Sequence, residues 1–275
     1  IFKYDGGNLM NLELLATPKT IEAIYQHYKV KRKNEHRPHL GGSQIGNECS
    51  RALWYQFRHA WRPSFDGRML RLFETGDREE DRIVSNLRAV GVKVWEKDPE
   101  TGKQIKFEAC GGHFALSLDG VGEGFAESSK PHTLEFKTMN DKNFKSMKNL
   151  GCKKSKPVYW AQCQIGMHLG DMDRCYFFAV NKNTDEMYGE RIKRDRAVGN
   201  LLVSKAKNII FSDTPPAKLN EDPSYWQCRF CSYFAVCHGC KVPEVSCRTC
   251  SHVTPEQDGT WSCAKGKPAV TCDEH

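Results

Sequence analysis

Long apolar segments are missing from this sequence. No run approaches the roughly 18 apolar residues that a membrane-spanning helix needs, and no charged segment leads into an apolar stretch as in a secretory leader. No internal repeat is present either. We therefore expect a cytoplasmic chain that is neither secreted nor bound to a membrane. Its 275 residues are enough for one large domain, with or without a small appendage.

Cysteine, in contrast, is abundant, and the 13 residues are an odd number. Many of them stand in closely spaced pairs toward the C-terminal end. In a reducing compartment disulfides are rare, so metal ligation is a better explanation for these pairs than a disulfide framework. We assign Cys110, Cys152, Cys163, Cys175 and Cys240 to packing or to no role.

Positive charge exceeds negative charge, with 41 Lys and Arg against 34 Asp and Glu, for a net charge of +7. This balance is compatible with a polyanionic partner but does not require one. The basic residues gather in two clusters: Lys29, Lys31, Arg32, Lys33 and Arg37; and Lys142, Lys145, Lys148, Lys153, Lys154 and Lys156. Each cluster is either a nucleic-acid-binding surface or a solvated face.

The spacing of apolar residues predicts the secondary structure. Helices are expected at residues 17–33, 47–59, 77–90, 157–169 and 195–210, and strands at 92–96, 103–108, 114–118, 133–138 and 173–180. This order predicts an α/β fold with a mixed central sheet flanked by helices. We interpret residues 1–16 as an N-terminal arm or a remnant of cloning, 17–240 as the main domain and 241–275 as a small module.

Two acidic residues and a lysine form the central motif. Asp119 ends one expected strand, and Glu135 lies in the next one, two residues before Lys137. Adjacent antiparallel strands can bring the two carboxylates together, and the spacing of two puts Glu135 and Lys137 on one strand face. Two carboxylates suit a hard divalent cation such as Mg²⁺ or Mn²⁺, to which the Phe136 carbonyl could add an oxygen. A lysine beside them can orient water or offset negative charge during phosphodiester hydrolysis. The alternative is a surface turn followed by a charged strand.

Two further polar residues add context. Glu80 shares a helix stripe with Ile83 and Val84, where a carboxylate is unfavourable unless it is paired or binds a metal. It could instead sit in water at a frayed helix start. Gln164 lies in the middle of the expected helix 157–169, where it either bonds a metal-bound water or substrate phosphate, or is an ordinary surface residue.

Taken together, these residues resemble the PD-(D/E)XK nuclease superfamily, in the RecB-like branch of lambda exonuclease and its YqaJ relatives. Four short motifs carry the resemblance: Gly76-x3-Glu80, Leu118-Asp119-Gly120, Glu135-Phe136-Lys137 and Tyr159-x4-Gln164. It implies a restriction-endonuclease-like core. It also implies roles for Glu80, Asp119 and Glu135 as metal-site acids, Lys137 as the catalytic lysine and Gln164 as the motif glutamine.

Four cysteines carry a second resemblance. Cys49 stands far upstream of Cys228, Cys231 and Cys237, a C-x2-C-x5-C group. This pattern is similar to that of the CRISPR-associated RecB-like exonucleases and the nuclease domain of AddB, and it implies a [4Fe-4S] cluster that clasps the two ends of the main domain. Four thiolates suit zinc equally well. Cys49 could instead be a small buried hydrophobe, and His238 or Cys240 could substitute as a ligand.

The last residues predict a zinc-ribbon-like module. Cys247, Cys250, Cys263 and Cys272 have zinc-ligand spacing, and Asp258-Gly259 indicates a hairpin turn beside Trp261. So short a segment needs the metal as its core. His275 or His252 could replace Cys272, and the alternative is a tail with surface thiols.

We therefore expect a DNA exonuclease of recombination, repair or phage replication, in a bacterial or phage-infected cell. Its substrate would be linear DNA or a single-stranded end, and recombination or replication proteins are candidate partners. The sequence carries no signal of an oligomeric state. Two alternatives stay open: a non-catalytic nucleic-acid-binding metalloprotein whose acids are structural, and a purely structural metalloprotein.

Overall fold

The computed structural model describes residues 17–31, 37–239 and 241–266. It divides into two compact units, one within Ile1–Glu35 and Ser64–Asp77 and the other comprising His36–Pro63 and Arg78–His275. Among the described residues, no helix has both the length and the apolar character that crossing a membrane demands. The expected arm at residues 1–16 and the basic residues Arg32 and Lys33 lie outside the described residues.

The first unit is built from helix α1 (Lys19–Lys31) and the beginning of helix α3 (Gly67–Ala89). The Tyr28 hydroxyl donates a hydrogen bond to the Glu74 carboxylate, and the Lys31 ammonium lies 3.3 Å from the same group. Gly67 passes so close to the main chain of Tyr25 that a Cβ there would lie 2.2 Å from the carbonyl oxygen. Helix α1 confirms the expected first helix.

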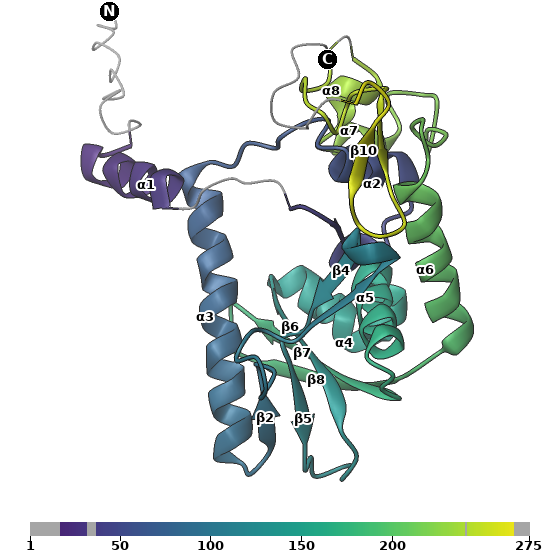
Figure 1. Cartoon of the computed structure of the whole chain (residues 1–275). Coiled ribbons are helices and arrows are strands. Elements are labelled where there is room, and N and C mark those ends of the chain that lie inside the picture. The colour runs from purple at the N-terminus through teal and green to yellow at the C-terminus, as the bar shows by residue number, and fades with distance from the viewer. Residues whose placement is uncertain (1–16, 32–36, 240, 267–275) are drawn as a thin grey trace, which may run out of the picture. The chain divides into compact units, whose positions relative to one another are not determined.

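The second unit contains a mixed sheet of five strands in the order β2-β5-β6-β7-β8 (Figure 1). These strands are β2 (Lys93–Trp95), β5 (Gly120–Glu123), β6 (His132–Met139), β7 (Arg174–Asn181) and β8 (Met187–Lys193). Strands β6 and β7 run parallel, and the other neighbours are antiparallel. The α/β class with a mixed central sheet is therefore confirmed.

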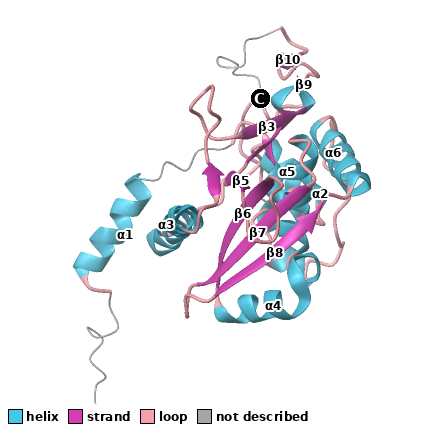
Figure 2. Cartoon of the chain, turned by 90° about the horizontal axis from the view of Figure 1, so that it is seen from below, coloured by secondary structure: helices cyan, strands magenta, loops and turns pink. Residues whose placement is uncertain are grey.

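Helices cover both faces of this sheet (Figure 2). On one face, Ile83, Val84 and Leu87 of α3 pack against Leu134 and Phe136 of β6. On the other face lie α4 (Asp141–Ser155) and α5 (Pro157–Leu169), and a second cluster includes Phe144, Met147, Cys163, Cys175 and Phe177. Successive residues of β6 and β7 thus point to opposite faces, as the pleat of a strand requires.

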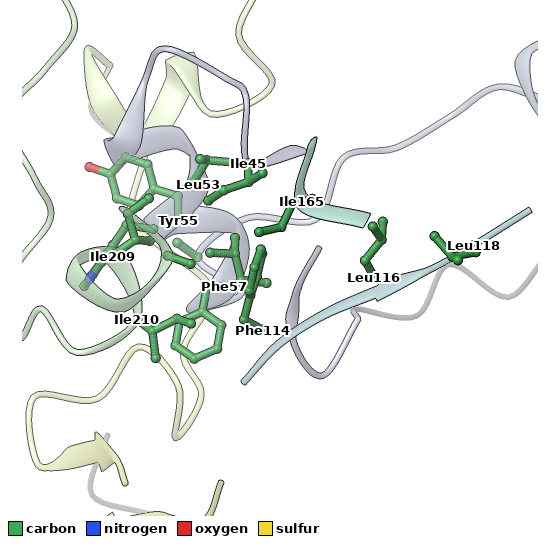
Figure 3. Packing of buried hydrophobic residues seen from close by; sticks show 14 residues of the cluster. Ile45, Leu53, Tyr55, Phe57, Phe114, Leu116, Leu118, Ile165, Ile209 and Ile210 are labelled. Carbon is green, nitrogen blue, oxygen red and sulfur yellow. The ribbon is translucent and has the colours of Figure 1, made fainter. Parts of the chain in front are cut away.

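A smaller sheet of three strands, in the order β1-β4-β3, forms a second centre of packing. Its strands are β1 (Leu40–Gly41), β3 (Lys106–Ala109) and β4 (Phe114–Ser117). A short 3₁₀ turn at Cys110–Gly112 joins β3 to β4, and another at Gly42–Gln44 follows β1. Helices α2 (Ser50–Phe57) and α6 (Arg196–Ile210) pack on it together with α5. Figure 3 shows the apolar side chains that meet there, among them Phe57, Phe114, Ile165 and Ile209.

The sequence-based expectation is wrong about which strand precedes Glu135. The sequence predicts strand β4 beside β6, but β4 pairs with β1 and β3 in the smaller sheet. The antiparallel neighbour of β6 is β5, which the sequence does not predict. The sequence Gly120–Glu123 has two glycines and too few apolar residues to signal a strand. Helix α4 and strand β8 were also missed, because α4 is rich in lysine and the burial of β8 is sparse.

The C-terminal part of the second unit has two short helices, α7 (Trp226–Arg229) and α8 (Phe234–Cys237), and the hairpin of β9 (Val253–Pro255) with β10 (Trp261–Cys263). The hairpin turn is where Asp258-Gly259 predicted it. Trp261 stacks on Phe57 of the main core, with ring centroids 5.3 Å apart. The guanidinium groups of Arg58 and Arg248 lie 5.3 and 4.5 Å from its ring centroid.

Gly259 makes the contact between this hairpin and the rest of the unit unusually close. Its φ is +91°, and a Cβ there would lie 1.9 Å from the carbonyl oxygen of Gly111. Gly91 has nearly the same φ, +90°, but faces open space. We expect Gly91→Ala to lower the free energy of unfolding by about 1 kcal/mol through backbone strain alone. Gly259→Ala should lower it further, because the contact with Gly111 must open. Equal losses for the two variants in urea unfolding would contradict this assignment.

His132 at the start of β6 provides a pH-dependent contribution to stability. Its side chain is 0% exposed, and burial lowers its pKa, as do Arg174 and Arg191. A depressed folded-state pKa means that stability is present above the unfolded value of about 6.5 and is lost as the pH falls below it. We expect the free energy of unfolding to fall between pH 7 and pH 5, with a shallower slope in His132→Gln. Identical slopes in the two proteins would show that His132 contributes nothing.

Candidate active site

The pairing of β5 with β6 brings Asp119 to Glu135. Gly120 pairs with Leu134, so the same register continued by one residue places Asp119 beside Glu135. The Asp119 Oδ2 atom accepts a hydrogen bond of 2.7 Å from the main-chain N–H of Phe136. This bond fixes the Asp119 carboxylate against the strand that carries the other two residues of the motif.

Glu135 and Lys137 project from β6 toward α5. The Lys137 ammonium forms an ion pair with the Glu135 carboxylate and also donates to the Phe136 carbonyl at 3.2 Å. It lies 5.4 Å from the centroid of the Tyr159 ring, which stacks on Phe177 behind it. The Glu135 side chain is 3% exposed and that of Lys137 is 22% exposed, so the pair is largely shielded from water.

The electrostatics of these groups favour a bound cation. Burial raises the pKa of Glu135 to about 8; Lys137 opposes the shift, and the carboxylates of Asp119 and Glu80 add to it. Burial likewise raises the pKa of Asp119. Burial alone lowers the pKa of Lys137, but the carboxylates of Glu135 and Asp119 raise it overall, so the lysine keeps its proton. In both carboxyls the cost of burying a charge outweighs the attraction of the Lys137 ammonium, and a proton or a metal ion relieves that cost.

Glu80 reaches this group from α3. It is partly exposed, and its charge acts on Glu135 from the turn before the buried Ile83 and Val84. The structure thus brings Glu80 into the electrostatic neighbourhood of the motif. Its proposed role as a metal ligand stays a prediction.

Gln164 has a different environment from either one expected. It is 1% exposed, so it is not a surface residue. Its Nε2 donates to the Lys193 carbonyl at 2.9 Å, and its Oε1 accepts from the Asp195 N–H at 2.7 Å. Both ends of the amide therefore hold the connection between β8 and α6, and a contact of Gln164 with water or phosphate stays a prediction.

Oxygen donors for a divalent ion are available at Asp119, Glu135 and the Phe136 carbonyl. Within the described ranges, no three His, Cys, Asp or Glu side chains are assembled so that they could hold a metal ion. Mg²⁺ is often bound by only one or two protein carboxylates, with water and substrate oxygens completing the shell. The donor set therefore fits Mg²⁺ or Mn²⁺. In this structure the Lys137 ammonium forms an ion pair with Glu135.

The four cysteines of the second resemblance lie in one neighbourhood. Cys49 is the N-cap of α2, and its Sγ accepts a 3.4 Å hydrogen bond from the Ala52 N–H. The Cys231 Sγ accepts a 3.4 Å bond from the Tyr233 N–H. Burial raises the pKa of Cys231, and Cys49, Cys237 and Cys228 add to the shift. The thiols are thus near enough to influence one another electrostatically, and their proposed joint binding of a metal stays a prediction.

The C-terminal cysteines are only partly described. Cys247 and Cys250 lie in a tight turn, where the Cys250 Sγ accepts a 3.5 Å bond from the His252 N–H, and Cys263 ends β10. Cys272 and His275, the two candidates for the fourth ligand, lie outside the described residues, as does Cys240.

Three solved structures are similar to the chain at low identity. One is the structure of SSO0001, with 14% identity, covering 79% of this chain and 96% of that chain at a TM-score of 0.44. Another is the alkaline exonuclease LHK-Exo of Laribacter hongkongensis, with 16% identity, 67% and 90% coverage and a TM-score of 0.43. The same exonuclease in complex with dAMP matches at 16%, with 62% and 85% coverage and a TM-score of 0.41. No protein-family model and no curated protein matches the chain.

Tyr159 is a site residue whose contact was not foreseen. Its ring packs against the apolar cluster that includes Phe144 and Phe177, and it also lies beside the Lys137 ammonium. The signal available in the sequence is its place at the start of the helix that follows the motif strand, which does not specify a partner.

The ion pair of Glu135 and Lys137 yields a stability test. Removing one partner of a buried pair leaves an uncompensated group, so we expect Lys137→Met to destabilise the metal-free protein by about 3 kcal/mol. Adding Glu135→Gln to that variant should recover much of the loss. The exposed pair Lys106–Glu108 has the same spacing on β3 and serves as the control; Lys106→Met should change stability by less than about 1 kcal/mol. Comparable losses at both positions would show that the Glu135 pair is not buried.

Proposed function

We propose that the chain is a metal-dependent DNA nuclease, an exonuclease of the PD-(D/E)XK type with a restriction-endonuclease-like core. The observation that carries the proposal is the convergence of Asp119, Glu135 and Lys137 at the junction of β5 and β6, where two carboxyls and an ammonium share a site largely shielded from water. Such a group is unfavourable for folding alone, and it is suited to a reaction in which negative charge develops on a phosphate.

Each residue has a distinct task in this proposal. Asp119, Glu135 and the Phe136 carbonyl would hold Mg²⁺ or Mn²⁺, which polarises the scissile phosphate and lowers the pKa of a bound water. Lys137, held between Glu135 and the Tyr159 ring, stays protonated and offsets the negative charge that develops on the phosphate oxygens. Glu80 would add a further carboxylate from α3. Gln164 supports the site by fixing the junction of β8 and α6.

Helix α4, which directly follows β6, supports a nucleic-acid substrate. It carries most of the second basic cluster. Its exposed lysines include Lys142, Lys145, Lys148 and Lys154. Lys145 and Lys148 form ion pairs with Asp141 and Glu186. Contacts from such lysines to phosphates give affinity without sequence preference. A role in recombination, repair or phage replication would follow from this substrate.

The cysteines would serve metal binding in the same protein. Cys49, Cys228, Cys231 and Cys237 fit a [4Fe-4S] cluster or zinc, because two of the sulfurs accept main-chain N–H bonds and basic side chains lie around the group. We assign zinc to Cys247, Cys250 and Cys263 in a zinc-ribbon-like module, with a fourth ligand beyond the described residues.

A cleavage assay tests the enzyme assignment. We expect linear end-labelled DNA to be degraded in Mg²⁺ or Mn²⁺ and to persist in EDTA. Asp119→Asn, Glu135→Gln and Lys137→Met should each lower the rate at least about 100-fold, because each removes charge from the reacting centre. Glu108→Gln and Lys106→Met, at the exposed pair of the same spacing, should keep the wild-type rate.

Two results would contradict the proposal. Equal rates for wild type and Asp119→Asn would assign the cleavage to another protein. Salt-dependent DNA binding without any metal-dependent cleavage would favour the alternative, a non-catalytic nucleic-acid-binding metalloprotein. A closed circular substrate compared with a linear one tests the exonuclease assignment, since an exonuclease leaves the circle intact.

A further inference from the structure

A lysine of α6 reaches the four-cysteine neighbourhood from a part of the chain that no motif marks. The Lys205 ammonium donates a hydrogen bond to the Asn47 carbonyl, and the Asn47 side chain in turn accepts a 2.9 Å bond from the Cys49 N–H. Lys205 is therefore tied to the loop that presents Cys49. Its side chain is partly buried.

No carboxylate pairs with this ammonium among the residues that the structure describes. The hydrogen bond of Lys205 goes to a neutral carbonyl, and the carboxylate of the nearby Glu48 accepts its hydrogen bond from Gln227 instead, at 3.0 Å. Burial lowers the pKa of Lys205, while the charges of Cys49 and Glu48 act in the opposite direction. A partly buried cation without an ion pair is unfavourable unless negative charge is supplied nearby.

The neighbouring cysteines supply that charge only as thiolates. Four neutral thiols carry none. Four thiolates around Zn²⁺ or a [4Fe-4S] core carry a net charge of about −2. Arg51 and Lys218 also act on Cys237, so basic side chains surround the sulfur group from more than one element.

We propose that Lys205 is the counter-ion of a metal–thiolate centre at Cys49, Cys228, Cys231 and Cys237. This inference rests on the proposed metal binding of those cysteines and is independent of the nuclease site. The metal centre would then hold three segments together: the loop before α2, the segment of α7 and α8, and α6, which contributes a counter-ion but no sulfur. Lys205 is a positioning residue for the centre and not a ligand.

Metal retention is the first test. Wild type, Lys205→Met, Lys205→Arg and the control Lys207→Met would be purified without oxygen. Iron and zinc are then measured by elemental analysis, and any cluster by its absorbance near roughly 400 nm. Lys207 is an exposed lysine of the same helix. We expect Lys205→Met to release metal to a chelator about 10- to 100-fold faster than wild type, as loss of an outer partner of a metal site does. Lys205→Arg and Lys207→Met should stay close to wild type.

The sign of the stability effect is the sharper test. In the metal-loaded protein, Lys205→Met should lower the melting temperature, because the anionic centre loses its counter-ion. In the reduced, metal-free protein the same change should leave the melting temperature unchanged or raise it, because it removes an uncompensated buried charge. A merely structural role, through the bond to Asn47, would lower both melting temperatures alike.

The outcomes separate the two proposals. A wild-type protein that takes up neither iron nor zinc would overturn the metal centre and the role of Lys205 with it, and would leave the cleavage assay unaffected. A second outcome would overturn the counter-ion role alone. In it the wild type binds metal, Lys205→Met retains the metal as well as wild type does, and Lys205→Met shifts the melting temperature in the same direction with and without metal. Loss of metal in Lys207→Met as large as in Lys205→Met would assign the effect to the net charge of α6.

Discussion

The placement of Glu135 in β6 constrains much of the second unit. Leu134 and Phe136 on either side of it are buried against α3, so Glu135 and Lys137 must emerge on the opposite face. A slip of β6 by one residue would bury these charged groups in the apolar cluster of α3 and expose the aromatic and aliphatic residues. The register is therefore fixed by hydrophobic burial, and the geometry of the charged group is a consequence of it. The hydrogen bond from Phe136 to Asp119 then adds the third member at no cost to the register.

The elements with strong apolar periodicity could be predicted from the sequence. Helix α5 begins at Pro157 and ends at Leu169 as expected, and β6 and β7 lie where their β-branched and aromatic residues indicated. Strand β5 could not be predicted, because glycine has a low preference for strands and two of the four residues are Gly120 and Gly122. Gly122 is needed for packing, since a Cβ there would lie 2.5 Å from the Phe125 ring. Helix α4 is interrupted at Gly151, whose φ of +72° is not helical, and most of its residues are polar, so its apolar periodicity is weak. The part of α3 before Asp77 belongs to the first unit, and its charged residues interrupt the apolar spacing that would predict a helix.

The candidate site divides in the same way. Residues two apart on one strand share a face, so the pairing of Glu135 with Lys137 follows from local geometry. The approach of Asp119 depends on which strand pairs with β6, and the sequence indicated the wrong neighbour while naming the right residue. Gln164 and Lys205 show the limit of motif reasoning, because their partners are main-chain atoms of distant segments. A glutamine or a lysine on a helix carries no local signal of such partners.

The two arginines around Trp261 have a consequence for how the chain can be divided. Arg58, from the end of α2, donates to the carbonyls of Val253 and Ser212, and Arg248, from the cysteine turn, donates to those of Phe57 and Pro38. Each guanidinium thus links an early to a late part of the sequence, and both lie close to the indole ring of Trp261. If α2 or the C-terminal hairpin unfolded alone, a guanidinium group would lose carbonyl acceptors that belong to the other segment. The closing stretch of the polypeptide is accordingly coupled in cooperativity to helix α2, although nearly two hundred residues separate them along the chain.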